Sequence, residues 1–471
     1  MQPFWLTLLI GLLVGSVGFA SVGDGTAPAL ALLPVAIVVA QQVFCIRYVL
    51  QAQSRKHIAV SIICLVQALW YFLPFLFYGI DPTFVSAEDI FQEGLFLRAE
   101  YGMLTLVSGF QMGIYSGVSR TFAFKFQKNA VVKLNPTQSI ILCGLLLTLG
   151  VTGYYFRPDF SVDEFDHFLQ SYGREFMPAA NRASSIALAG GIVATLAVRE
   201  FFLGGRFLPL ICALFPLYNA VMLAVVNGRR QVIFQFGSML LFGLVAYARN
   251  PFRILAAVSL PILVLFATAG VFRSAKGLED SGESWVATTV VQPIHELSQT
   301  ASYHARLLHS QSINGPLLGG TYLENVVYAV PLISYVIGAP EKIAYYHQII
   351  LDTVDWAGQF FYTMGSSFLS ELYANFDILA PVAAVALGWA MGRLMSWLVA
   401  NIHNIQFYLY GCLFFDLSIW STRCSFGEHY GQMRFIVIII LITKAIKSAQ
   451  FMNRRAAPSA IEAGPTVAQV G

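Results

Sequence analysis

The chain has 471 residues, of which 57% are hydrophobic and only 11% are charged, and its mean hydropathy is +0.66. A soluble domain carries about a quarter charged residues, so this composition excludes a set of ordinary water-soluble domains. The formal net charge of +3 is too small to indicate a nucleic-acid-binding protein. The composition instead predicts an all-α polytopic membrane protein.

The cysteines and histidines give no sign of a disulfide framework or a metal site. Only Cys424 falls in a predicted loop, and the chain has no CxxC pair. The histidines show neither the HExxH nor the HxxxH spacing of metal ligands. The other cysteines lie within apolar runs, where a thiol behaves as a small hydrophobic group: Cys45, Cys64, Cys143, Cys212 and Cys412. We therefore expect no metal ion and no cofactor.

Apolar runs of about 16 to 22 residues recur along the chain, and a helix of about 20 such residues crosses the ~30 Å hydrocarbon core of a bilayer. Polar residues and Pro or Gly breaks bound about twelve of these runs. The first run lacks the basic segment that opens a signal sequence, so we expect it to remain a helix. The predicted spans are 4–21, 28–49, 58–79, 101–118, 137–155, 184–202, 207–226, 231–247, 254–272, 377–398, 405–420 and 434–449.

Basic residues between the spans predict the orientation of the chain, because short cytoplasmic loops collect Lys and Arg. With the N-terminus inside, the basic loops fall on the cytoplasmic side, and both termini are expected there. The acidic loops 81–100 and 157–182 then face outward. The basic residues that this orientation places inside lie at 47–56, 120–133, 199–206, 249–253, 393 and 444–455.

The spans and loops divide the chain into four expected regions. These are nine transmembrane helices in 1–272, a large external loop in 273–376, three further helices in 377–449 and a disordered cytoplasmic tail in 450–471. A loop as long as the second region is normally functional. Within it, Val290–Ser310 has apolar residues three or four apart. This spacing predicts an amphipathic helix that lies on the membrane surface or over a cavity.

Two arginines stand where the orientation rule does not expect them. Arg229 and Arg230 interrupt two apolar spans at the end predicted to face outward. A guanidinium near hydrocarbon is usually paired, and an anionic substrate group is one suitable partner. Arg423 and Arg434 lie in a second short loop on the same predicted face, so four arginines could gather around a lipid-linked pyrophosphate. The alternatives are a locally inverted hairpin for the first pair and Arg–Glu pairs or headgroup contacts for the others.

A reaction on a sugar hydroxyl would also need a proton acceptor, and Glu371 is the first candidate. It lies in segment 365–377, immediately before the tenth predicted span, which places it at the water–lipid boundary. Glu324 and the histidines of the large loop are the other candidates. The competing interpretation of Glu371 is an interfacial carboxylate that caps the helix or pairs with Arg423. The residues predicted to contact a glycan are Tyr373, Asn375 and His429.

Three stretches resemble the Wzy-type polymerases of O-antigen and capsule oligosaccharide repeat units. They are Leu318–Asn325 leading to Pro331, Ser366–Phe376 with its Ser-Glu-Leu-Tyr-Ala-Asn-Phe core, and Gly228–Arg230 at the start of a span. A many-span chain with a large external loop late in the sequence has the same layout. The resemblance implies a metal-independent, GT-C-like glycosyltransferase of the bacterial inner membrane, related to the O-antigen ligases.

In that family the donor is a growing glycan on undecaprenyl pyrophosphate, and the acceptor is a single lipid-linked repeat unit on the periplasmic face. The resemblance implies that the arginines hold the pyrophosphate and that Glu371 deprotonates the attacking hydroxyl. It also implies membrane lipids and a regulator of chain length as partners.

Two other functions compete with the polymerase. O-antigen ligases share this layout but carry a histidine where this chain has Ser366-Ser367, which favours a polymerase. A flippase or other transporter of lipid-linked oligosaccharides would place charged residues along a path through the membrane. Asp416 lies within a predicted span, where it either holds an arginine or lines such a path.

Overall fold

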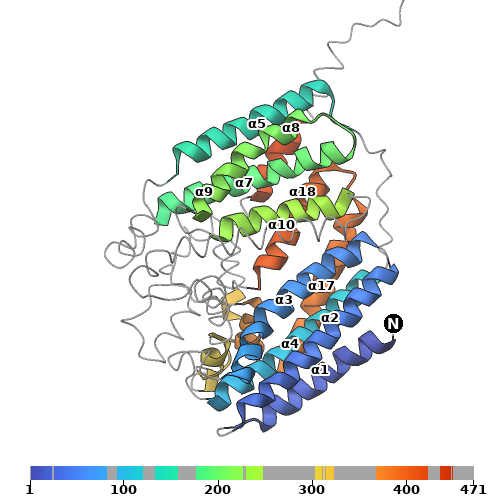
Figure 1. Cartoon of the computed structure of the whole chain (residues 1–471), viewed down its shortest axis with the longest axis vertical. Helices are drawn as coiled ribbons and strands as arrows, with labels where there is room; N and C mark the ends of the chain where they lie inside the picture. Colours follow the sequence, from blue (N-terminus) through green and yellow to red (C-terminus); the bar gives the residue numbers. More distant parts are fainter. Residues whose placement is uncertain are drawn as a thin grey trace, which may run out of the picture.

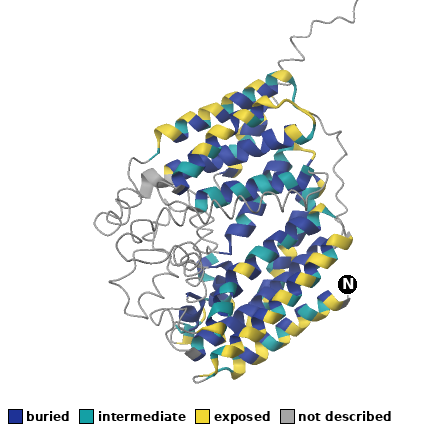
Figure 2. Ribbon diagram, viewed as in Figure 1, coloured by how far each residue is buried: buried dark blue, intermediate teal, exposed yellow. Residues whose placement is uncertain are grey.

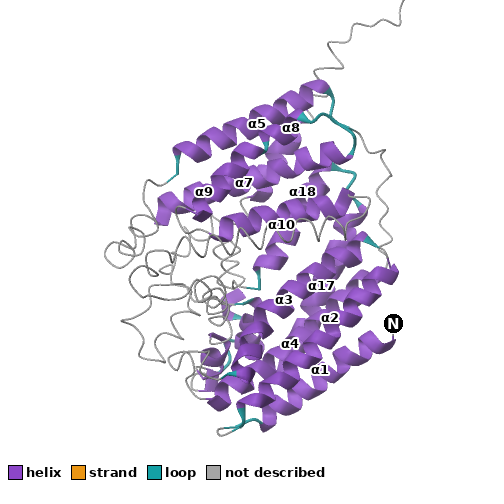
Figure 3. Ribbon diagram, viewed as in Figure 1, coloured by secondary structure: helices purple, strands orange, loops and turns teal. Residues whose placement is uncertain are grey.

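The computed structural model describes most of the helical part of the chain. Among the described residues the chain is helical apart from short turns, and it contains no strand (Figure 3). These residues are 2–23, 26–52, 54–81, 93–119, 133–157, 177–225, 230–247, 303–309, 311–312, 315–322, 367–422, 435–446 and 448.

The helices lie side by side with roughly parallel axes (Figure 1). The first half contains α1 (Gln2–Ser21), the 3-10 helix η1 (Pro28–Ala31), α2 (Leu32–Ala52), α3 (Arg55–Ile80), α4 (Glu93–Ser119), α5 (Pro136–Tyr155), α7 (Met177–Phe202), α8 (Leu208–Cys212), α9 (Leu214–Val225) and α10 (Arg230–Tyr247). The second half contains α16 (Phe368–Phe376), the 3-10 helix η4 (Asp377–Leu379), α17 (Ala380–Ala400) and α18 (Ile405–Trp420), and a further helical segment at Phe435–Ile446.

Six helical segments are long and apolar enough to cross a membrane, as judged by length and composition: Pro3–Ser21, Pro28–Gln51, Arg55–Ile80, Pro136–Tyr155, Arg182–Phe202 and Phe368–Ala400. Shorter apolar helices occupy Leu208–Ala224, Gln231–Tyr247, Ile405–Trp420 and Phe435–Ile446. Apolar side chains are exposed on the outer faces of the bundle, where water-soluble proteins place polar ones (Figure 2). The chain is therefore a helical membrane protein. Twelve crossings stay a prediction, because the expected ninth span, 254–272, lies outside the described residues.

Helix α4 packs against α17 with its backbone in close approach. A Cβ atom added at Gly113 would collide with the carbonyl oxygen of Val385, and one added at Gly392 would collide with that of Ile114. Small residues spaced by four allow this approach, and such packing is a main source of association between membrane helices. The glycines concerned are Gly109, Gly113 and Gly117 on α4 and Gly388 and Gly392 on α17. These contacts place α4 in the interior of the bundle.

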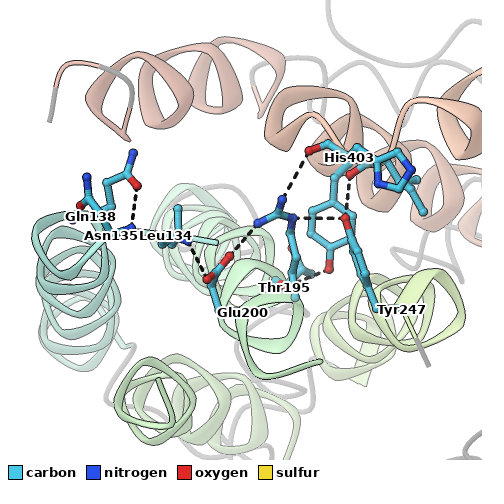
Figure 4. A network of polar contacts seen from close by, with 10 residues as sticks. Leu134, Asn135, Gln138, Thr195, Glu200, Tyr247 and His403 are labelled. Atoms are coloured by element: carbon cyan, nitrogen blue, oxygen red, sulfur yellow. Dashed lines mark hydrogen bonds and ion pairs between the residues drawn. The ribbon is translucent and has the colours of Figure 1, made fainter. Parts of the chain in front are cut away.

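At one end of the bundle, a buried arginine ties several helices together (Figure 4). The Nη1 atom of Arg199 donates to Oε1 of Glu200 over 2.6 Å, and its Nε donates to the Tyr247 hydroxyl over 3.1 Å. Its Nη2 donates to the carbonyl oxygen of His403 over 3.3 Å. Oε2 of Glu200 accepts from the Leu134 amide over 2.9 Å. The ends of α7 and α10, the α17–α18 turn and the segment before α5 therefore meet here, at what we call the Arg199 end.

The opposite end of the bundle holds α16, and we call it the Glu371 end. The Phe368 amide at the start of α16 donates to the carbonyl oxygen of Ser421, just past α18, over 3.1 Å. The Phe19 ring near the end of α1 lies 5.7 Å from the Tyr373 ring of α16. The described helices thus begin and end alternately at the two ends, in the order that the predicted crossings require. Tyr247 lies at the Arg199 end and Tyr303 at the Glu371 end.

One expectation about the external segments is wrong, and another is tested only in part. Glu100 was expected in an acidic loop, but α4 already begins at Glu93 and Glu100 is fully buried, because the helix continues outward beyond its apolar run. The part of the expected amphipathic helix that the structure describes, 303–309, is buried on nearly all sides rather than on one face. This part therefore packs into the protein, and the expected position of the whole segment on the membrane surface or over a cavity stays a prediction, because most of it lies outside the described residues. The predicted tail, 450–471, lies outside the described residues.

Candidate functional site

Helix α16 carries the site, and its own sequence fixes where it begins. The hydroxyl of Ser367 caps the helix by accepting from the Ser370 amide over 3.0 Å, as serine does at the first position of many helices. The ring of Phe368 lies 5.2 Å from that of Phe110 on α4, which anchors the helix to the bundle interior. After one short helix, Asp377 has a positive φ of 48°, and this break separates α16 from α17. The result is a short helix set at the end of the bundle.

Glu371 lies in the first turn of α16 and is buried, with 1% of its surface exposed. Its Oε1 accepts a hydrogen bond from the Thr321 hydroxyl over 2.7 Å. Asn375, one turn later, uses its Nδ2 atom to donate to Thr321 Oγ1 and to the Glu371 carbonyl oxygen, each over 2.7 Å. We call Thr321, Glu371 and Asn375 the Glu371 network. Ser367, not Glu371, caps the helix, and the alternative pairing of Glu371 with Arg423 lies outside the described residues.

A tight turn brings Thr321 to this position. Leu318 and Gly319 both have positive φ, 50° and 87°, a conformation that glycine adopts readily and leucine rarely. The Leu317 amide donates to the carbonyl oxygen of Ala374 over 2.9 Å, so the turn is fastened to α16 itself. Residues about fifty positions apart in the sequence therefore form one buried polar group.

Aromatic side chains surround the network. Tyr373, a predicted glycan contact, is half-buried and has the His304 and Phe19 rings each 5.7 Å from its own. Tyr322 stacks on Phe376 with ring centroids 6.0 Å apart and an angle of 20° between the planes. Burial lowers the pKa of His304 to about 3, so this imidazole is neutral at pH 7. Its two ring nitrogens have no hydrogen-bond partner among the described residues.

The structure places only some of the predicted site residues. It places Glu371, Tyr373 and Asn375 on the same short helix, where Asn375 bonds to Glu371 and Tyr373 contacts His304. Arg230 opens α10 at the end of that helix away from Tyr247, and its side chain is not described. Thr422, the last described residue before Arg423, directly follows the contact between Ser421 and α16. The remaining candidates lie outside the described residues: Glu324, Arg229, Arg423, His429 and Arg434.

Sequence reasoning missed two features of the interior. Thr321 lies inside the stretch Leu318–Asn325 but was not singled out, because a threonine becomes informative only once its partner is known. Asp416 of α18 accepts a hydrogen bond from the Ser238 hydroxyl of α10, and within the described residues no arginine contacts it. The arginine partner that the sequence analysis considered for Asp416 is therefore not seen in this part of the chain. Its other oxygen, Oδ2, is buried without a partner among these residues.

No group of three or more His, Cys, Asp or Glu side chains in the described part of the chain is arranged to hold a metal ion. The arrangement at α16 can instead accept a proton or orient a hydroxyl group, since it combines a carboxylate, a hydroxyl and an amide. No protein-family model, no curated protein and no solved structure matches this chain.

Proposed function

We propose that this protein is a membrane-embedded glycosyltransferase that polymerises lipid-linked oligosaccharide repeat units. The donor is a growing glycan on undecaprenyl pyrophosphate, and the acceptor is a single lipid-linked unit. The observation that carries the proposal is the Glu371 network, a buried carboxylate that accepts from Thr321, whose hydroxyl oxygen in turn accepts from Asn375, where α16 meets the end of the helical bundle. A positioned carboxylate of this kind suits the general base that activates a sugar hydroxyl.

In the proposed reaction, a hydroxyl oxygen of the acceptor attacks the anomeric carbon of the donor. The bond from that carbon to the pyrophosphate oxygen breaks, and undecaprenyl pyrophosphate leaves with the bonding electron pair. Glu371 takes the proton of the attacking hydroxyl. Glu371 is 1% exposed, so water has little access to the carboxylate that takes this proton.

The charge that develops on the leaving pyrophosphate needs cationic partners, and the proposal assigns this role to four arginines. They are Arg229, Arg230, Arg423 and Arg434. Two features of the described chain support the assignment. The start of α10, at Arg230, is at the end of that helix opposite the Arg199 end, and Ser421, two residues before Arg423, bonds to the start of α16. The described residues next to both arginine loops therefore lie at the Glu371 end.

The proposal places the protein in a bacterial inner membrane, with the Glu371 end in the periplasm and both termini in the cytoplasm. The alternation of helix ends supports this orientation, because the segments richest in basic residues adjoin the Arg199 end. A regulator of glycan length would be a further partner.

A flippase for lipid-linked oligosaccharides is the second candidate, and one observation favours it. Polar side chains without partners among the described residues are fully buried in the helices, as they would be along a path through the membrane. They include Gln67 on α3 and Glu100 and Gln111 on α4, and the Oδ2 atom of Asp416 on α18 is likewise buried without a partner among these residues.

Deletion of the gene, followed by separation of lipid-linked and surface saccharides by size, distinguishes these functions. We expect cells left with a single repeat unit on the surface, and restoration of long chains by the wild-type gene but not by a Glu371→Gln variant. Long lipid-linked polymer without attached glycan would indicate a ligase instead. Single units trapped on the cytoplasmic side would indicate a flippase.

A further inference from the structure

We infer that Thr321, itself oriented by Asn375, donates a hydrogen bond to Glu371 that favours the ionised form of this carboxylate, and that Thr321 is a positioning residue for it. The inference about the carboxylate is argued from the arrangement of the hydrogen bonds. The importance of this carboxylate for catalysis rests on the proposed function.

The direction of the hydrogen bonds follows from the number of protons available. A threonine hydroxyl has one proton to donate, and a side-chain NH₂ group only donates. Because Asn375 Nδ2 donates to Thr321 Oγ1 over 2.7 Å, the hydroxyl oxygen is already the acceptor in that contact. Its single proton is therefore directed at Glu371 Oε1, also 2.7 Å away. That carboxylate oxygen must accept, and it accepts most strongly when Glu371 is ionised, so the bond favours the ionised form; a proton on the carboxyl group would have to reside on Oε2.

The backbone of α16 fixes the orientation of the Asn375 amide, on which this argument depends. Nitrogen and oxygen of an asparagine side chain are distinguished by their partners. Nδ2 lies 2.7 Å from the Glu371 carbonyl oxygen, which only accepts. A flipped amide would place two acceptor oxygens against each other at that distance. The spacing of four residues between Glu371 and Asn375, one helical turn, therefore sets the direction of the whole network.

Water cannot readily replace these bonds, because the three side chains are buried. Thr321 is 5% exposed, Glu371 1% and Asn375 0%. In a dry site, an ionised carboxylate depends on the donors that the protein supplies. Loss of the Thr321 hydroxyl should therefore favour the protonated form of Glu371, which cannot take a proton from a substrate.

Infrared spectroscopy of the purified full-length protein in lipid vesicles tests the effect of Thr321 on the protonation of Glu371 without relying on activity. The carbonyl band of protonated Glu371 is assigned by its absence in Glu371→Gln and followed during a pH titration. Thr321→Val removes the hydroxyl at nearly constant shape, and we expect it to move the titration midpoint upward by about one pH unit or more, the size typical of one bond to a charged group. Thr321→Ser keeps the hydroxyl and should restore the wild-type midpoint. Should Thr321→Val fail to fold, Thr321→Ala provides the same comparison.

An unchanged midpoint in Thr321→Val or Thr321→Ala overturns the inference, whatever the activity. An equal shift in Thr321→Ser and Thr321→Val also overturns it, because the hydroxyl would then not be the cause. Polymer formation from lipid-linked repeat units, measured on the same vesicles, tests the proposed function separately. For a polymerase, Thr321→Val should move the acidic limb of the pH–rate profile upward by the same amount. A shifted infrared midpoint in a wild-type protein that makes no polymer would support the network and refute the polymerase.

Discussion

Arg199 and Glu200 are neighbours in the sequence, and their side chains form an ion pair that is 1% and 2% exposed, with 2.6 Å between Arg199 Nη1 and Glu200 Oε1. The pair joins two groups of helices, because Arg199 reaches Tyr247 and His403 while Glu200 reaches Leu134 (Figure 4). Burying two charges is costly, and their attraction and hydrogen bonds largely offset that cost. Removing one charge leaves the other buried without compensation.

Glu200→Gln should therefore destabilise the protein by about 3 kcal/mol or more, since an uncompensated guanidinium would remain in the interior. Thermal unfolding in detergent measures this. The matched comparison is Arg199→Gln alone and together with Glu200→Gln. If the pair acts as a unit, the double variant should be clearly more stable than the sum of the single effects predicts. Additive losses would mean that the two side chains stabilise the fold independently.

The contact between α4 and α17 leads to a second prediction. Gly113→Ala puts a Cβ atom against the backbone of Val385, which cannot rotate away, so we expect a loss of about 1 to 3 kcal/mol and a lower yield of monodisperse protein. Gly144→Ala on α5 is the control, because nothing lies within 4 Å of the added atom there. Equal melting temperatures for the two variants would contradict the close packing of α4 and α17.

The apolar runs predicted most of the described helices well, because about 20 apolar residues in sequence suffice to specify a membrane helix. The start of α4 was missed, since Arg98 and Glu100 interrupt the apolar pattern although they belong to the helix. This part of α4 packs against α3, where Phe96 contacts Phe75, and it also faces His304, which lies about two hundred residues later. Hydropathy along the sequence does not record which helices become neighbours.

The site was also predictable only in part, because the sequence shows the residue types along one helix but not the contacts between distant segments. Glu371 stands out because it is a carboxylate beside a long apolar run, and Asn375 shares its helix one turn later. The sequence does not single out Thr321 as a partner of Glu371. That contact depends on a turn in which the Leu317 amide donates to the carbonyl oxygen of Ala374. The burial of His304 was equally hidden, since only the packing of its helix against Tyr373 removes it from water.

The proposed role of Glu371 leads to a third prediction. Glu371→Gln should bind the donor lipid but lose turnover by about 10²-fold or more, the usual scale for removal of a general base. Turnover is measured with lipid-linked repeat units, and donor binding is measured separately. Glu324→Gln is the comparison, because Glu324 is the competing candidate. Unchanged turnover in the first variant with a loss in the second would transfer the role to Glu324.

The arginines of the first external loop provide a fourth prediction. Arg229→Ala and Arg230→Ala should abolish long polymer while protein level and membrane insertion stay normal, because the pyrophosphate would lose its cationic partners. Arg206→Ala is the control, since this exposed arginine lies just past α7, at the Arg199 end. Wild-type polymer lengths in both loop variants would refute the assignment of these arginines to pyrophosphate.

The buried imidazole of His304 predicts how stability depends on pH. Burial lowers its pKa from the ordinary 6.5 to about 3, so below pH 6.5 the unfolded chain binds a proton that the folded protein does not. Stability therefore falls as the pH is lowered from 6.5 towards 3, by about 2 kcal/mol at pH 5. His304→Phe keeps an aromatic ring beside Tyr373 and should remove this part of the pH dependence, whereas His309→Phe on the same helix should not. Thermal unfolding of the three proteins at pH 7 and pH 5 measures the effect. Equal losses on acidification in wild type and His304→Phe would show that other groups cause the acid sensitivity.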